Sequence, residues 1–225
     1  RGPPEALRVR VGRKRALRAG TGLLAALLGY LLLAPSRIDP VAYQPPKRGN
    51  PHRAFAPNRE LLGARRLAAG RLSGPEDVAL GEGAVLLTGT ADGKIKRVSL
   101  LNEAVEDFAD TGGRPLGLRF DPQGRLIVCD AKKGLLAIDG EGRVTVLATE
   151  AGGRPFRFTN NLDIAKDGTI YFSDASDAYG PDGYLYDLLE ARPRGRVLSH
   201  DPATGETRVL LDGLYFANGV ALSRD

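Results

Sequence analysis

The sequence contains no tryptophan and no methionine, and it has only one cysteine and two histidines in 225 residues. A single cysteine, Cys129, cannot form an internal disulfide, so no disulfide framework holds this fold together. The histidines, His52 and His200, are not spaced like metal ligands, which argues against a zinc site built from histidine and cysteine. Without an initiator methionine, the first residue is expected to be a processed end or a cut within a longer reading frame.

Basic residues are concentrated at one end of the chain. The net charge is +5, but residues 1–18 carry seven basic residues against one acid, and the remainder is nearly neutral. A nucleic-acid-binding surface needs basic residues spread over a folded face, with aromatic residues among them. The basic excess therefore indicates a tail, and we expect no nucleic-acid partner.

An uncharged run follows this tail over residues 19–34. Counted from residue 16, with one arginine inside it, the run approaches the roughly twenty residues that a helix needs to cross a bilayer. The basic flank predicts a single-pass anchor with a cytoplasmic N-terminus over residues 1–18 and an extracytoplasmic main domain, periplasmic if the source is bacterial. A cleaved signal peptide has the same order and is the alternative, although the run lacks a good small-x-small cleavage site.

Short apolar, β-branched runs alternate with glycine-rich turns after residue 70, beyond a proline-rich linker and entry segment over residues 35–70. Three units repeat a turn containing Asp or Gly followed by an apolar strand, which is the pattern of antiparallel hairpins. They cover residues 81–100, 121–147 and 165–211, and the third contains an insertion over residues 179–194. No amphipathic helix is expected after residue 35, apart from one helical turn near residues 186–191.

The repeat interval is 40 to 57 residues, measured between the apolar strands that open near Asp77, Gly117, Leu162 and Gly219. A period of roughly 40–50 residues with four short strands per unit is typical of a β-propeller blade. The sequence thus predicts an all-β propeller over residues 71–225, with three to four blades present. Because a propeller closes into a ring to remove its edges, we expect further blades after residue 225.

Polar residues stand at the start of three predicted blades: Glu76, Asn160 and Asn218. The first strand of each blade lines the central channel, so these side chains are expected to converge on one axis. A carboxylate with carboxamide oxygens suits a hard cation such as Ca²⁺. Taken singly, each residue is also typical of a turn. Because such residues recur at the same position in three repeating units, a cation site is favoured.

Four strings, in this order, carry a resemblance to a known family: GPEDVAL, GRPLGLRFDPQGRLIVCDAKKGL, FTNNLDIAKDGTIYFSDAS and FANGVALSRD. They resemble the strictosidine synthase-like branch of the six-bladed propellers, which includes the adipocyte plasma membrane-associated proteins. This branch is similar more distantly to the paraoxonases and to the gluconolactonases of the SMP-30 type. The resemblance covers about residues 72–225 and implies a six-bladed β-propeller.

The resemblance also implies roles for particular residues. In the calcium-dependent hydrolases of this superfamily, a Glu and two Asn bind the catalytic ion, and they match Glu76, Asn160 and Asn218. A further Asp ligand would lie beyond residue 225. The paraoxonases hold a second, structural calcium, for which Asp77 matches one ligand, whereas Asn161 replaces an Asp. This replacement removes a charge and weakens the case for that second ion.

Other positions depart from the family pattern or have a simpler interpretation. Leu116 stands where the paraoxonases have one His of a proton-handling pair, but gluconolactonase-like members work without that pair. The catalytic Glu of the strictosidine synthases would lie in a late blade, outside this sequence. Asp174 is a possible acid, although a structural role tying strands together is favoured. Cys129 is predicted to be a buried thiol, and His52 and His200 to be solvated.

The leading hypothesis is a calcium-dependent ester or lactone hydrolase, arylesterase-like, with Ca²⁺ or another divalent cation polarising the carbonyl group of a small-molecule substrate. A different class of function fits the same fold, because propellers serve many roles. The alternative is a non-catalytic, membrane-tethered propeller that binds a small molecule or a partner. A Pictet–Spengler-type synthase is less favoured.

Overall fold

The computed structural model describes residues 5–45, 47 and 57–223, and for side chains it describes residue 18 onward. The chain divides into two units, residues 1–39 and residues 40–225. The first unit contains one helix, α1 (Glu5–Leu33). His52, which is predicted to be solvated, lies outside the described residues.

The membrane anchor expected over residues 19–34 is not supported. Within the described residues, no helix is both long enough and apolar enough to cross a membrane. The uncharged part of α1 begins at residue 19 and the helix ends at Leu33, which is shorter than the roughly twenty apolar residues that a span requires. The predicted single-pass topology, with an extracytoplasmic propeller, is likewise not supported.

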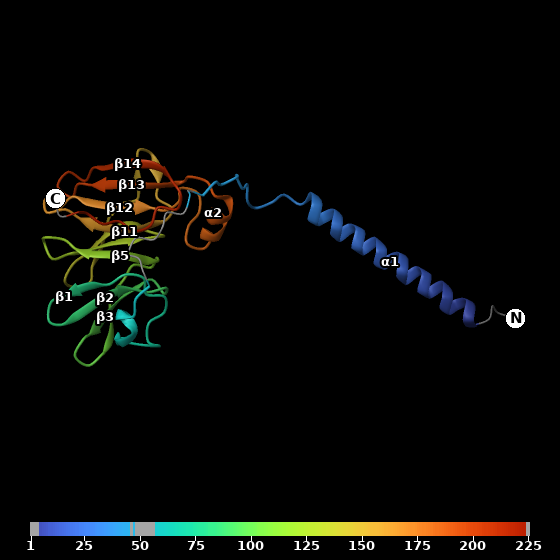
Figure 1. Ribbon diagram of the computed structural model, residues 1–225, viewed down its shortest axis with the longest axis horizontal. Coiled ribbons are helices and arrows are strands. Elements are labelled where there is room, and N and C mark those ends of the chain that lie inside the picture. Colours follow the sequence, from blue (N-terminus) through green and yellow to red (C-terminus); the bar gives the residue numbers. More distant parts are fainter. Residues whose placement is uncertain (1–4, 46, 48–56, 224–225) are drawn as a thin grey trace. The chain divides into compact units, whose positions relative to one another are not determined.

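The second unit contains three four-stranded antiparallel sheets, each a meander of consecutive strands (Figure 1). The first sheet consists of β1 (Ala79–Gly81), β2 (Val85–Gly89), β3 (Lys94–Ser99) and β4 (Val105–Asp110). The second consists of β5 (Pro115–Phe120), β6 (Leu126–Asp130), β7 (Gly134–Ile138) and β8 (Val144–Ala148). The third consists of β11 (Thr159–Ile164), β12 (Ile170–Asp174), β13 (Gly195–His200) and β14 (Thr207–Leu214). The predicted all-β class and its four-stranded repeating units are confirmed, whereas closure into six blades stays a prediction.

Three small elements lie outside these sheets. A 3-10 helix, η2 (Glu60–Gly63), precedes the first sheet, and the hairpin β9 (Glu150–Ala151) with β10 (Arg154–Pro155) connects the second sheet to the third. The helix α2 (Tyr184–Glu190) lies in the insertion between β12 and β13, where the sequence predicts one helical turn. Asp174, the last residue of β12, pairs with Thr159 at the start of β11 and with Arg196 near the start of β13. The insertion that carries α2 therefore leaves the third sheet at the end where β11 begins.

The hairpin turns follow from local chemistry. In the turn between β5 and β6, the Asp121 carboxylate accepts hydrogen bonds from the backbone N–H groups of Gln123 and Arg125, at 3.0 and 2.8 Å. Gly124 adopts a φ of 78°, a conformation that glycine reaches without a steric penalty. An aspartate that hydrogen-bonds its own backbone two residues on is a standard turn former, which is why this pattern predicts the hairpin correctly.

The core consists of two apolar layers, one on each side of the second sheet. Leu126 and Val128 pack with residues of the first sheet, such as Ile95, whereas Ile127 and Cys129 pack with residues of the third, such as Phe172. All of β6 is buried because neighbouring sheets cover both of its faces, so its sequence is a continuous apolar run and not an alternating one. Cys129 is buried as predicted, and burial raises the pKa of its thiol well above the usual value.

The expectation that His200 is solvated is wrong. His200 ends β13, opposite Ile170, and is 2% exposed. Its ring Nδ1 lies 2.9 Å from the Thr207 hydroxyl. The strand-to-turn position suggested exposure, but the side chain lies inside the sheet and burial lowers the pKa of the imidazole.

Candidate functional site

β5 and β11 are the first strands of the second and third sheets, and each has a shift in its pairing register at the same point near its start. The pairing register of β5 shifts between Pro115 and Leu118, and that of β11 shifts between Thr159 and Leu162. Such bulges turn side chains out of the regular alternation and are frequent beside functional sites. The one in β11 holds Asn160 and Asn161.

The two strands approach each other closely at these irregularities. A Cβ atom on Gly117 would lie 2.7 Å from the Cα atom of Asn161 and 2.8 Å from the carbonyl oxygen of Asn160. Contacts this short with backbone atoms leave room for glycine alone. Gly117 therefore allows the starts of neighbouring sheets to converge, as the propeller hypothesis requires.

Asn160 is the predicted ligand with the most distinctive surroundings. It is 8% exposed, and its carboxamide forms no hydrogen bond among the described residues. The amide atoms of Asn160 are not fully buried, so solvent reaches them. The Asn160 carboxamide is thus available to bind something that the protein itself does not supply.

Asp77 follows the predicted ligand Glu76, and Asn161 follows the predicted ligand Asn160. Each forms hydrogen bonds with a segment far away in the sequence. The Asp77 carboxylate accepts hydrogen bonds from the Leu118 backbone N–H, at 3.3 Å, and from the Arg119 guanidinium, at 2.7 Å. The Asn161 side-chain oxygen accepts one from the Val220 backbone N–H, at 3.1 Å. These oxygens are occupied by protein donors.

Ser173, in β12, connects Asn218 to β11. Its hydroxyl donates to the Asn218 carbonyl oxygen, at 2.5 Å, and accepts from the Asn161 backbone N–H, at 3.2 Å. The Asn218 side chain is exposed. The structure therefore brings the backbones of two predicted ligand positions, 160–161 and 218, against the same serine.

Glu76 is bound to a residue that the sequence reasoning did not single out. The Arg114 guanidinium donates to a Glu76 carboxylate oxygen, at 3.1 Å, and also to the Gly74 carbonyl oxygen, at 2.9 Å. The Glu76 side chain is 55% exposed and that of Arg114 is 16% exposed. Among the described residues, no hydrogen bond joins Glu76 to Asn160 or to Asn218. The string GRPLGL contains Arg114, but nothing in its spacing relates this arginine to Glu76.

Asp174 is engaged entirely within the third sheet and its surroundings. One carboxylate oxygen accepts from the Phe158 backbone N–H, at 2.8 Å, and the other accepts from the Arg196 guanidinium, at 2.9 and 3.0 Å. Both side chains of this ion pair are fully buried, and burial raises the pKa of the Asp174 carboxyl. Asp130, in the second sheet, accepts in the same way from the Arg114 backbone N–H, at 2.8 Å. These contacts favour a structural role for both aspartates, which fix the segment that leads into the first strand of each sheet.

Aromatic rings lie beside two of the predicted ligand positions. Phe158, two residues before Asn160, contacts Phe216, two residues before Asn218, edge to face with ring centroids 5.5 Å apart. Both rings belong to a small apolar cluster that includes Leu116. In the part of the chain that the structure describes, no group of three or more His, Cys, Asp or Glu side chains could hold a metal ion.

Comparisons with known proteins agree with the repeated meanders. The family model for strictosidine synthase matches residues 160–225, and the model for the N-terminal part of strictosidine synthase-like proteins matches residues 54–98. A solved gluconolactonase from Xanthomonas campestris superposes with a TM-score of 0.52 and 20% identity, covering 63% of this chain and 48% of that one. At this identity the likeness concerns the fold alone, and it supports the propeller.

Curated relatives are much more similar in sequence. Strictosidine synthase-like protein 4 of Arabidopsis thaliana is 47% identical over 75% of this chain and 47% of its own length. The adipocyte plasma membrane-associated protein of Mus musculus is 38% identical over 95% of this chain and 55% of its own length. The chain spans about half the length of these relatives. With both family models matching at the strings that contain Glu76 and Asn160–Asn218, the chain belongs to the strictosidine synthase-like family.

Proposed function

We propose that this chain contributes to a calcium-dependent hydrolase site for small esters or lactones, at the end of the propeller where β1, β5 and β11 begin. Its family and the similarity of its fold to a gluconolactonase support this class of reaction. Since the chain spans about half the length of its curated relatives, the activity belongs to the whole protein, of which these residues form one part.

The unpartnered carboxamide of Asn160 is the observation that carries the proposal. Asn160 is 8% exposed, it lies in the irregular part of β11, and no donor among the described residues binds its carboxamide oxygen. A carboxamide oxygen is a typical calcium ligand, and a bound cation would replace the solvent that reaches this group. The neighbouring Asn161 offers no such opportunity because its oxygen accepts from Val220.

The donor set fits one calcium ion better than two. Glu76, Asn160 and Asn218 offer a carboxylate and two carboxamides, which are the oxygen ligands that Ca²⁺ prefers. Asp77 and Asn161, the predicted ligands of a second ion, use their oxygens for hydrogen bonds between segments. We therefore assign no second ion to them. When bound, calcium would act as a Lewis acid toward the substrate carbonyl.

The remaining residues prepare this end of the propeller for a polar reaction. Arg114 binds one oxygen of Glu76 and fixes the direction of the carboxylate, and the other oxygen forms no hydrogen bond among the described residues. Phe158 and Phe216 contact each other two residues before the two asparagines, and an apolar wall at this place would lower the local dielectric and strengthen electrostatic interactions. The chain thus supplies ligands, orientation and partial exclusion of water.

A non-catalytic binding propeller is the second candidate, and two observations favour it. Leu116, which is 4% exposed, stands where the paraoxonases have a histidine. The Glu76 carboxylate is partly neutralised by Arg114 and so attracts a cation less strongly than an isolated acid would. In this case the end of the propeller binds a small molecule without transforming it.

The first prediction separates the two candidates by measuring turnover of phenyl acetate and of a small lactone by the purified protein. We expect hydrolysis that is lost on treatment with a calcium chelator and restored by added Ca²⁺. Glu76→Gln should reduce kcat/KM by about a hundredfold, because it removes the only charged ligand of this set. Calcium affinity, measured by titration calorimetry, should fall in parallel.

Glu82→Gln is the matched control, because Glu82 is an exposed glutamate that follows β1 while Glu76 precedes it. This variant should keep the activity and the calcium affinity of the wild type. Turnover that survives complete removal of calcium would contradict the hydrolase proposal. Calcium binding without turnover of any ester or lactone would favour the binding propeller.

A further inference from the structure

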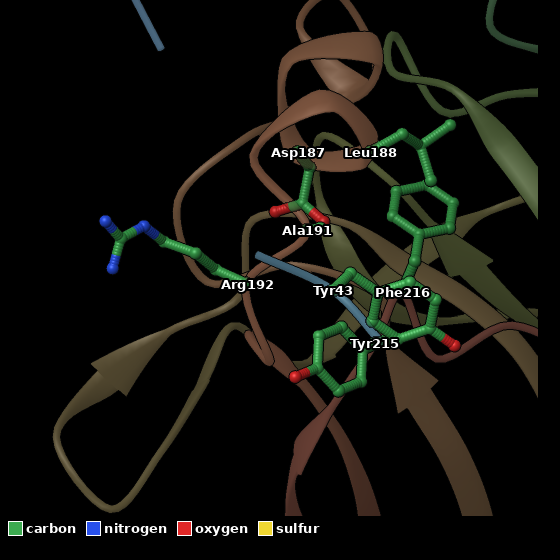
Figure 2. Close-up of a pocket in the computed structure, with 7 residues that line it drawn as sticks. All are labelled: Tyr43, Asp187, Leu188, Ala191, Arg192, Tyr215 and Phe216. Atoms are coloured by element: carbon green, nitrogen blue, oxygen red, sulfur yellow. The ribbon is translucent and has the colours of Figure 1, made fainter. Parts of the chain in front are cut away.

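A separate pocket lies between α2 and two other segments of the second unit (Figure 2). Its volume is about 170 Å³, and its walls include Leu188 of α2, Tyr43 of the segment before the sheets, and Tyr215 and Phe216 after β14. It contains none of the predicted calcium ligands, although it shares Phe216 with the apolar cluster that includes Phe158. A ligand bound there therefore needs no metal ion, and the inference does not rest on the proposed hydrolase.

The size of this pocket selects a single ring. A protein cavity of about 150 Å³ lined by apolar side chains is known to accept one benzene molecule. The pocket beneath α2 is of the same size but open to solvent on one side, because the Tyr43 and Tyr215 side chains are 50% and 55% exposed. One six-membered ring fits it, and a bicyclic compound would extend beyond it.

Three aromatic rings form one part of the wall. The rings of Tyr43 and Tyr215 lie 5.3 Å apart between centroids, tilted by 57°, and Phe216 lies next to Tyr215 in the sequence. The Val41 backbone N–H donates to the Glu190 carbonyl oxygen, at 2.9 Å, which fixes the segment of Tyr43 against the end of α2. Tilted and edge-on arrangements of this kind are those that aromatic rings prefer, so a further ring is well accommodated.

A carboxylate, that of Asp187, faces this apolar surface. Asp187 is 2% exposed, and one of its carboxylate oxygens accepts from the Ser176 hydroxyl, at 2.6 Å. Its other oxygen forms no hydrogen bond among the described residues, and Figure 2 shows the carboxylate between the helix and the tyrosine rings. Because a buried acceptor gains from a donor, a ligand with a hydroxyl group matches this position.

The charges around the pocket favour a neutral ligand. Two buried carboxylates, Asp187 and Glu190, lie near two guanidinium groups: Arg194 is 3.8 Å from Asp187 and 2.6 Å from Glu190, and Arg192 is 4.0 Å from Glu190. The Arg192 guanidinium points away from the aromatic rings (Figure 2). With acids and bases balanced, neither an ammonium group nor a carboxylate of the ligand would find an uncompensated partner.

We propose that this pocket binds a neutral, monocyclic hydroxyaromatic compound of the size of phenol, with its ring against Tyr43, Tyr215 and Phe216 and its hydroxyl donating to Asp187. The insertion between β12 and β13 is then a binding element that the β-strand repeat itself does not require. Its helix supplies both the apolar wall, through Leu188, and the acceptor, through Asp187.

The test is the binding of phenol and of fluorobenzene to the protein, measured by ligand-observed NMR in the presence of a calcium chelator. Fluorobenzene has nearly the same shape as phenol but no donor. We expect phenol to bind about tenfold more tightly, which is the order of effect of one hydrogen bond to a charged acceptor. Equal affinities of the two compounds would overturn the role of Asp187.

Two neighbouring substitutions on α2 locate the site. Leu188 lines the pocket and is 50% exposed, whereas Leu189 does not line it and is 61% exposed. Leu188→Trp fills the pocket and should weaken phenol binding by about tenfold or more, whereas Leu189→Trp should leave it within about twofold. Circular dichroism verifies that both variants fold. Phenol affinity that Leu188→Trp leaves unchanged would overturn the proposal.

Discussion

At the scale of single residues, environment decides what each polar group can do. Asn160 and Asn161 are adjacent and chemically identical, yet the Asn160 side chain forms no hydrogen bond among the described residues, whereas the Asn161 side chain accepts one from Val220. Asp174 resembles a catalytic acid in sequence, but the Arg196 guanidinium and the Phe158 N–H occupy its oxygens. The type of a side chain therefore identifies candidate ligands and catalytic groups. Its hydrogen-bond partners then show whether its oxygen atoms are available to a ligand or are already bound by the protein.

His200 gives a prediction about stability and pH. Burial lowers the pKa of His200, so the folded protein favours the neutral imidazole. A lowered pKa in the folded state contributes stability that is present above the unfolded pKa of about 6.5 and is lost as the pH falls through the folded value. We expect the free energy of unfolding, measured by urea denaturation, to decrease from pH 7 toward pH 5. His200→Gln should remove part of this decrease, and identical pH profiles of the two proteins would contradict the prediction.

At the scale of elements, the strands could be predicted and their irregularities could not. Aspartate–glycine turns such as the one at Asp121 mark hairpins locally, because the side chain hydrogen-bonds its own backbone. The bulges in β5 and β11 lie where two different sheets approach each other, and no local sequence pattern indicates this approach. For the same reason the sequence gives the candidate ligands but neither the ion pair of Glu76 with Arg114 nor the burial of His200.

Gly117→Ala tests the close approach of β5 to β11. The added Cβ atom would lie 2.7 Å from the Asn161 Cα atom, and a backbone atom cannot move aside as the end of a side chain can. We expect the free energy of unfolding to fall by about 1–3 kcal/mol, as for other overpacked positions. Calcium affinity should fall as well, because Asn160 lies at the same contact.

Gly140→Ala provides the control for this substitution. No atom lies within 4 Å of a Cβ placed on Gly140, in the turn between β7 and β8. Its effect on the free energy of unfolding should stay within about 0.5 kcal/mol, as is usual for surface changes. If the two variants lose stability equally, the contact between β5 and β11 does not constrain the fold as described.

At the scale of the whole second unit, the middle sheet joins its neighbours into one cooperative structure. Residues of β6 contribute alternately to the apolar layer shared with the first sheet and to that shared with the third. Hydrogen bonds of Asp77 and Asn161 add polar links between segments far apart in the sequence. A unit connected in this way is expected to lose its sheets together and not one at a time.

Ile127→Ala tests this cooperativity. Ile127 is fully buried between the second and third sheets, so truncation leaves a cavity and should lower the free energy of unfolding by about 2–5 kcal/mol. Leu101→Ala, at a position 83% exposed, should change it by less than about 0.5 kcal/mol. In native-state hydrogen exchange, the most protected amides of the first sheet should lose protection together with those of the third, although Ile127 belongs to the apolar layer shared with the third sheet. A substitution in the apolar layer next to the third sheet can lower amide protection in the first sheet only if all three sheets unfold in a single transition. Loss of amide protection confined to the third sheet would therefore show that each sheet unfolds by itself.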